Sequence, residues 1–209
     1  RRWKAEHPGA VVVSYVNTSA AVKAESDYCC TSGNAKAVIE AIPADREILF
    51  LPDVFLGTWL ERVTGRKLRL WMGECHVHAG IRPADIDRWR QRAPEAELLV
   101  HPECGCASQA LAFGGDGAKV LSTEGMVSYA KASTGGRFMV ATETGILHRL
   151  RAEMPEKTFD PLREDAVCRF MKMTTLESVR ESLVRGQHVI TVPPATADRA
   201  REAIRRMVE

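Results

Sequence analysis

The chain has 209 residues, of which 45% are hydrophobic and 27% are charged, and its formal net charge is +2. This composition argues against a disordered chain, and the length suffices for one large domain or two small ones. Basic and acidic residues are interleaved without a block of one sign, so we expect no nucleic acid partner. The sequence contains no apolar run of roughly 18 residues and no signal peptide, which favours a cytoplasmic protein without a membrane span.

Short apolar segments alternate with helical patterns through the first part of the chain. Residues 1–6 look like the last turns of a helix, so we expect a further segment before them. Gly65 is a stop signal for the third of the helices predicted below. Such alternation is typical of a parallel sheet. The predicted strands cover 10–15, 28–32, 48–51 and 67–72, and the predicted helices cover 20–25, 35–42 and 54–63.

The same alternation begins again after residue 80. The last predicted helix places arginines on one face and small apolar residues on the other, so we expect one solvated and one packed face. The fold class predicted for the whole chain is α/β, with two similar three-layer αβα units that contain short parallel sheets. The strands predicted here cover 96–100, 119–121, 138–141, 157–162 and 188–192, and the helices cover 83–92, 125–132, 146–153, 176–184 and the residues from 196 on.

Equal spacings indicate that the two halves are repeats of one unit. Ser32 precedes Asp53 by 21 residues, and Ser122 precedes Glu143 by the same 21 residues. Each acidic residue ends a predicted strand and opens a predicted helix. A duplicated strand-helix domain explains such matched spacing.

A cysteine closes each repeat, which sets the predicted domain limits. Cys75 follows the first acidic residue by 22 residues, and Cys168 follows the second by 25. We expect domains over 1–79 and 80–209, with both cysteines at the junction. Cysteines too far apart for a zinc ribbon suggest a metal held between domains, and thiolates are the ligands of iron-sulfur clusters. The alternative is that each cysteine is a small buried residue.

Reactive side chains gather where predicted strands end. Ligands of open α/β sheets bind beyond the carboxyl ends of the strands, where these groups could act as a base, an acid or metal ligands. Hydroxyl groups at helix starts could hold a carboxylate or phosphate, although each could also be an ordinary helix cap. The candidates are His101, Glu103 and Cys104 after one strand, Tyr15 and Asn17 at the end of another, Thr31 with Ser32, Ser122 with Thr123, and His76 and His78 beside Cys75.

In combination, six short motifs of this chain resemble those of the quinolinate synthase family. The resemblance runs in unbroken order from about residue 11 to residue 172. The motifs are SYVNTS at 14–19, CTSGNA at 30–35, GECHVH at 73–78, HPEC at 101–104, LST at 121–123 and TETG at 142–145.

The resemblance implies a fold and a cofactor. The family joins three similar α/β domains about a pseudo-threefold axis, and one cysteine from each domain binds a single [4Fe-4S] cluster. By this resemblance Cys75 and Cys168 are two of the three ligands. The third belongs to a first domain that would precede Arg1. We therefore expect this chain to contain only the second and third domains, and to be inactive when isolated.

The resemblance also implies a reaction and a set of site residues. Iminoaspartate condenses with dihydroxyacetone phosphate, and loss of phosphate and water gives quinolinate for NAD biosynthesis, with an open iron of the cluster as the Lewis acid. We also expect a functional link to L-aspartate oxidase. Glu103, His101 and Tyr15 are the implied catalytic residues. The implied substrate-binding residues are Tyr15, Asn17, Ser32, His78, His101, Glu103, Ser122 and Thr123.

Two other functions remain open from the residues themselves. Cys75, His78 and either His101 or Cys104 could bind zinc in a hydrolase, with Glu103 as the base. Alternatively, the chain could be an α/β module that holds a dicarboxylate without turning it over. The metal found in the purified full-length protein distinguishes iron chemistry from zinc chemistry and both from a metal-free binding module.

Overall fold

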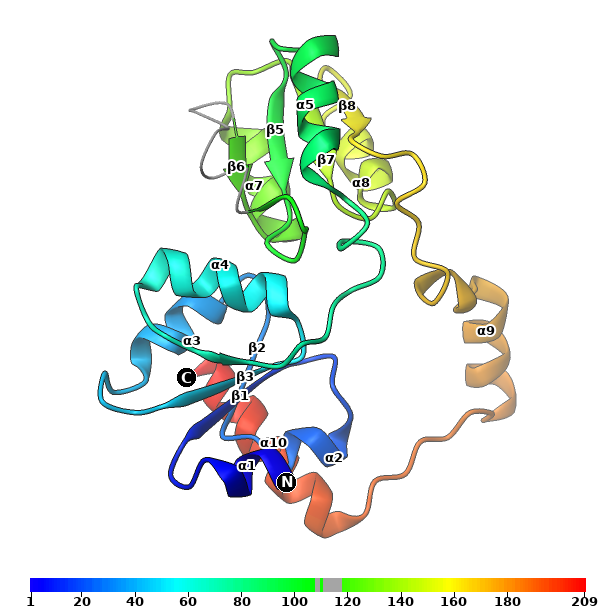
Figure 1. Ribbon diagram of the computed structural model, residues 1–209. Coiled ribbons are helices and arrows are strands. Elements are labelled where there is room, and N and C mark those ends of the chain that lie inside the picture. The colour runs from blue at the N-terminus through cyan, green and yellow to red at the C-terminus, as the bar shows by residue number, and fades with distance from the viewer. Residues whose placement is uncertain (108–109, 111–117) are drawn as a thin grey trace.

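The computed structural model describes residues 1–107, 110 and 118–209, and it contains two separate four-stranded parallel sheets (Figure 1). The first sheet has the order β2-β1-β3-β4 and the second has the order β6-β5-β7-β8. All pairings are parallel in both sheets, which confirms the predicted α/β fold class. Within the described part of the chain, every helix is too short or too polar to cross a membrane.

The first unit is a three-layer structure, because its central strand β1 is buried on both faces. One face packs against α3 and α4, and the other carries Trp3 of α1 against Val12 and Leu49. β-branched residues dominate β1, as expected for a strand buried on both sides. The elements are α1 (Arg2–Glu6), β1 (Val11–Tyr15), α2 (Ala20–Lys23), β2 (Tyr28–Cys30), α3 (Ala35–Ala41), β3 (Ile48–Leu51), α4 (Val54–Thr64) and β4 (Arg69–Leu70).

Helix α4 shows how local sequence fixes an element in this unit. Asp53 caps its start by accepting the Leu56 N–H at 2.8 Å. Gly65 ends it with φ at 69°, in the left-handed region that favours glycine. Leu56 and Leu60 are fully buried against the sheet. The cap contributes about 1 kcal/mol, and each buried leucine about 1.5–3 kcal/mol relative to exposure.

The second unit repeats the three layers. Ile86 and Trp89 of α5 pack on one face of the sheet with Leu98, while α7 and α8 cover the other face around Leu99 and Phe138. The elements are α5 (Pro83–Arg92), β5 (Glu97–Val100), β6 (Ala118–Val120), α7 (Thr123–Ala132), β7 (Arg137–Ala141), α8 (Ile146–Glu153) and β8 (Thr158–Pro161).

The last part of the chain returns from the second unit to the first. After a short 3₁₀ turn at Met171–Met173, helix α9 (Leu176–Arg185) stands away from both sheets, and α10 (Pro194–Val208) packs against α2 and β2 (Figure 1). The prediction of a strand over 188–192 is wrong. These residues form no strand, and Val189 and Ile190 are 76% and 85% exposed. An apolar run becomes a strand only where a neighbouring strand accepts its backbone hydrogen bonds.

Candidate functional site

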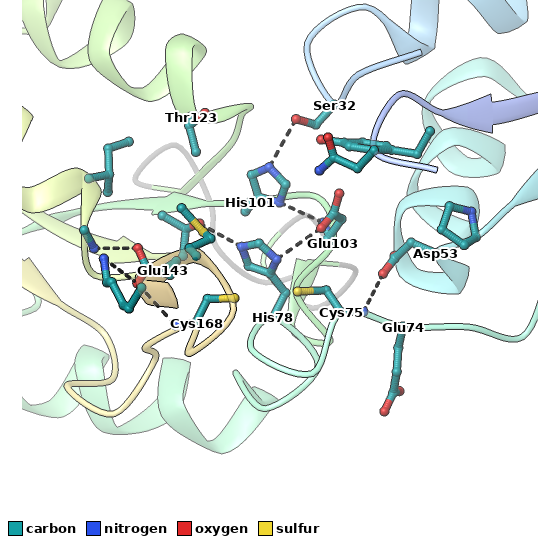
Figure 2. Close-up of a pocket in the computed structure, with 18 of the residues that line it drawn as sticks. Ser32, Asp53, Glu74, Cys75, His78, His101, Glu103, Thr123, Glu143 and Cys168 are labelled. Carbon is teal, nitrogen blue, oxygen red and sulfur yellow. Dashed lines mark hydrogen bonds and ion pairs between the residues drawn. The ribbon is translucent and has the colours of Figure 1, made fainter. Parts of the chain in front are cut away.

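A cavity of about 770 Å³ is lined by residues of both units. Its walls come from the carboxyl ends of the strands of both sheets and from the segments that follow those strands, which is where ligands of parallel sheets bind. Figure 2 shows the side chains that face it. The sequence-predicted residues that line the cavity are Tyr15, Asn17, Ser32, Cys75, His78, His101, Glu103, Thr123 and Cys168.

Two histidines stack at the centre of the cavity. The rings of His78 and His101 have centroids 4.4 Å apart and planes 14° from parallel. His78 Nδ1 lies 3.1 Å from Glu103 Oε2, and its Nε2 lies 2.8 Å from Thr142 Oγ1. His101 Nδ1 accepts the Glu103 backbone N–H at 3.4 Å, so its Nε2 carries the proton and donates to Ser32 Oγ at 3.1 Å. The hydrogen bonds therefore fix both imidazole rings.

The stacked rings have opposite proton affinities. Burial alone would lower the pKa of His78, but its interactions with Cys75 and Glu103 outweigh burial and raise it to about 9. Burial and the positive charge of His78 lower the pKa of His101 to about 4. At neutral pH the cavity therefore contains one imidazolium and one neutral imidazole.

The environment of the cavity also changes the pKa values of Glu103 and Tyr15. Burial alone would raise the pKa of Glu103, but its interactions with His78, His101 and Tyr15 together outweigh burial and lower it. Burial, followed by the charge of Glu103, raises the pKa of the Tyr15 phenol. Glu103 is thus a carboxylate that can accept a proton, and Tyr15 is a neutral phenol that can donate one.

Cys75 and Cys168 reach the cavity from loops of different units, and Figure 2 shows their thiols facing one another beside His78. Burial alone would raise the pKa of Cys75, but His78 outweighs burial and lowers it, which favours the thiolate. Both cysteines are partly buried, whereas the chain's remaining cysteines, Cys29, Cys30, Cys104 and Cys106, are fully buried and do not line this cavity.

The donor atoms fit a thiolate-bound metal group. Two thiols on separate loops can serve as two ligands of one iron-sulfur cluster. A second arrangement overlaps the first, because the ligand atoms of Cys75, His78 and Glu103 all lie within 4.8 Å of one another. That set, with sulfur, nitrogen and oxygen donors, suits a single zinc ion with an open position.

Comparison with known proteins decides the family. The model of the quinolinate synthetase A protein family matches residues 1–209, the whole chain. The chain belongs to the quinolinate synthase family. It is 55% identical over 206 residues to a quinolinate synthase of Thermus thermophilus, covering 99% of this chain and 66% of the relative. It is 52% identical over 216 residues to that of Mycobacterium sp. strain KMS and 50% identical over 216 residues to that of Mycobacterium tuberculosis.

The chain spans about two thirds of the length of these quinolinate synthases. The two mycobacterial proteins are covered over 64% and 62% of their lengths, while all of this chain is matched in each. The high identity shows the family membership expected from the sequence motifs.

Ser122 is the predicted binding residue that the cavity leaves out. Its hydroxyl accepts the Gly125 N–H at 3.1 Å and caps α7. The next residue, Thr123, lines the cavity instead. A cap and a ligand site both place a hydroxyl residue at a helix start, so the sequence pattern does not separate the two roles.

Several cavity residues of this quinolinate synthase family member were not predicted as site residues. Thr142 follows β7 directly, so its place at a strand end was a usable signal. Asp53 served in the sequence only as a marker of the repeat, whereas Glu143 marked the repeat and also belongs to the TETG motif. Lys172 pairs with Glu143 at 3.2 Å, and Arg149 also lines the cavity. Neither cation lies in a motif, so only folding brings them to the site.

Proposed function

We propose that the full-length protein is a quinolinate synthase of the cytoplasm that acts in NAD biosynthesis. It condenses iminoaspartate with dihydroxyacetone phosphate to form quinolinate, phosphate and water. The observation that carries this proposal is the cavity, which is lined by nine of the ten site residues implied by the family resemblance, all but Ser122. We also propose a functional link to L-aspartate oxidase, which would supply iminoaspartate.

The proposed cofactor is a [4Fe-4S] cluster held by Cys75, Cys168 and a third cysteine outside this chain. When bound, such a cluster supplies an open iron that polarises a substrate hydroxyl or carboxylate. The lowered pKa of Cys75 and the common cavity of the two thiols support this assignment. With two of three ligands, the isolated 209-residue chain is expected to be inactive.

Substrate binding in this proposal depends on charge and on hydroxyl donors. Both substrates are anionic, and His78 is positively charged at neutral pH because its pKa is about 9. Thr123 is the first residue of the ten-residue helix α7, where free backbone N–H groups favour carboxylate or phosphate. Ser32 and Asn17 line the same cavity. These groups would hold the carboxylates and the phosphate.

Proton transfer is assigned to Glu103, with His101 and Tyr15 as partners. The Glu103 carboxylate is 12% exposed and hydrogen-bonded to His78, so its position is fixed. It would accept the proton from carbon during enolisation and return a proton to the departing hydroxyl during dehydration. Neutral His101 donates its Nε2–H to Ser32, and the Tyr15 phenol remains protonated as a donor.

Anaerobic purification of the full-length protein tests the proposal. We expect a brown protein that contains iron and sulfide and that forms quinolinate from the two substrates. A colourless protein with stoichiometric zinc would instead favour the hydrolase alternative, which the Cys75, His78 and Glu103 cluster supports. A metal-free protein that binds quinolinate without forming it would favour the binding module.

A further inference from the structure

In the first unit, a buried carboxylate connects the start of a helix to the loop that presents Cys75. Asp53 is 5% exposed and uses both oxygens: Oδ1 accepts the Leu56 N–H at 2.8 Å and Oδ2 accepts the Cys75 N–H at 3.0 Å. Beside it, the Val54 N–H donates to the Gly73 carbonyl at 2.8 Å. The cysteine loop is therefore fastened by one side-chain bond and one backbone bond.

The second unit fastens Cys168 in the same way. Glu143 is 8% exposed, and its Oε2 accepts the Gly145 N–H at 2.7 Å while Oε1 accepts the Cys168 N–H at 3.2 Å. The Thr144 N–H donates to the Ala166 carbonyl at 2.9 Å. Here too, a buried carboxylate spans a helix start and a cysteine amide.

The bonds correspond position by position. In each unit the residue after the acid donates to the carbonyl two residues before the cysteine, and the acid accepts the N–H of the cysteine itself. The correspondence holds although the intervals from acid to cysteine are 22 and 25 residues. The second interval is three residues longer, and a contact made by chance would not survive such an insertion. The repeated pattern therefore indicates that the bonds have the same role in both units.

We propose that Asp53 and Glu143 are positioning residues that fix the backbone of Cys75 and Cys168 and so direct both thiols into the shared cavity. This inference rests on the proposed function, because it matters to chemistry only where the two thiols hold the metal group. Outer groups that orient metal ligands commonly change metal affinity by about 10- to 100-fold when removed.

Asp53 and Glu143 each accept two backbone N–H groups, one with each carboxylate oxygen. An amide side chain replaces one acceptor with an NH₂ donor, so Asp53→Asn and Glu143→Gln must each lose one bond. Asp53→Ser goes further, because serine retains the helix cap to Leu56 but has no second oxygen for Cys75. That variant separates the cysteine contact from the stability of α4.

The test uses the full-length protein with these three variants and two controls. Asp27→Asn alters a carboxylate of the first unit that accepts the Val12 N–H at 2.8 Å, and Glu97→Gln alters one of the second unit that accepts from Tyr129 and Ser133. Neither control residue lines the cavity. Amide hydrogen exchange of the metal-free protein and the rate of iron release to a chelator are measured for each variant.

We expect amide exchange at Cys75 to accelerate by about 10-fold or more in Asp53→Ser and Asp53→Asn, and exchange at Cys168 to accelerate similarly in Glu143→Gln. Iron release from these variants should be about 10- to 100-fold faster than from wild type and the controls. Wild-type exchange at both cysteines would overturn the inference, as would accelerated exchange with unchanged iron release. If wild type binds no iron, the proposed cofactor fails, and the exchange data alone decide whether the carboxylates fix the cysteine loops.

Discussion

The two units share one framework but carry different chemistry at the same position. Strand β1 pairs Ser14 with Leu51, two residues before Asp53, and β5 pairs Val100 with Ala141, two residues before Glu143. The residues that follow Ser14 and Val100 therefore correspond. Tyr15 of the first unit occupies the place of His101 in the second, and Asn17 occupies the place of Glu103.

The two units of this duplicated fold therefore place different chemical groups at corresponding positions. At the strand end of the first unit stand a phenol and an amide, which donate hydrogen bonds at neutral pH without changing charge. The second unit has an imidazole and a carboxylate there, and because the pKa of each is lowered, both are unprotonated at neutral pH and can accept a proton. Both pairs face one cavity, so substrate binding is expected to depend more on the first unit and proton transfer more on the second.

The largest expected effect comes from substituting the two corresponding residues Glu103 and Asn17. In the full-length enzyme, Glu103→Gln should lower kcat by about 10²- to 10⁴-fold, because the amide cannot transfer the proton. Asn17→Ala should mainly raise KM, since it removes a binding contact. Steady-state kinetics and iron content are measured for both. Loss of iron in Glu103→Gln with retained turnover would make Glu103 structural, and His101 would be the next proton carrier to test.

The stacked histidines predict that the free energy of unfolding of the metal-free full-length protein falls on both sides of about pH 6.5, which gives an acidic limb and an alkaline limb. His101 has a folded pKa of about 4 against an ordinary 6.5, so the free energy of unfolding should fall as the pH falls from 6.5 to 4. His78 has a folded pKa of about 9, so the free energy should also fall as the pH rises from 6.5 to 9. Each limb is worth up to about 3 kcal/mol.

Urea unfolding across this pH range measures both limbs, and two variants assign them. His101→Gln should flatten the acidic limb and His78→Gln the alkaline limb. A dependence that persists in both variants would show that the two rings do not differ in proton affinity as the cavity predicts.

A smaller effect is expected from the cavity hydroxyls. Thr123→Val keeps the shape of the side chain but removes its hydroxyl, and Ser32→Ala does the same at the strand end of the first unit. A hydrogen bond to a charged group is worth roughly 1.5–3 kcal/mol, so quinolinate affinity should fall by about 10-fold or more in each variant. Calorimetric titration of the full-length protein measures the affinity. Unchanged binding would remove the hydroxyls from the proposed anion site.

The smallest effect is expected at the helix cap. Ser122→Ala removes the acceptor for Gly125 and should lower the free energy of unfolding by about 1 kcal/mol, with quinolinate affinity close to that of wild type. Helix α3 of the first unit offers the comparison, because Asn34 at its start makes no capping bond to the helix. Thermal unfolding and titration are measured together. A loss of affinity as large as that of Thr123→Val would return Ser122 to the substrate site.

Local pattern determined most of the secondary structure. Apolar runs bounded by prolines, glycines and capping residues located the eight strands of the two sheets, including β1 and β5, within a few residues. These signals are legible because burial on both faces of a parallel sheet requires a short continuous apolar run. The sequence also selected Cys75 and Cys168 from six cysteines, and the structure brings both to one cavity.

The tertiary structure decided which of the local possibilities were realised. The apolar residues 188–192 form no strand because no neighbouring strand pairs with them, and α10 packs on the first unit although it follows the second. Neither result could be predicted from the local sequence, because the hydrogen-bond partners and packing surfaces of a segment lie far from it in the chain.

For the same reason, the sequence located the site residues but did not determine their charges or contacts. Sequence placed His78 and His101 near strand ends, but only folding stacks their rings and gives one a pKa of about 9 and the other about 4. It marked Asp53 and Glu143 by equal spacing, but their bonds to the cysteine amides depend on loops that meet after folding. Residue type and spacing determine which groups reach the carboxyl ends of the sheets, whereas burial and contacts between the units determine their charge and orientation.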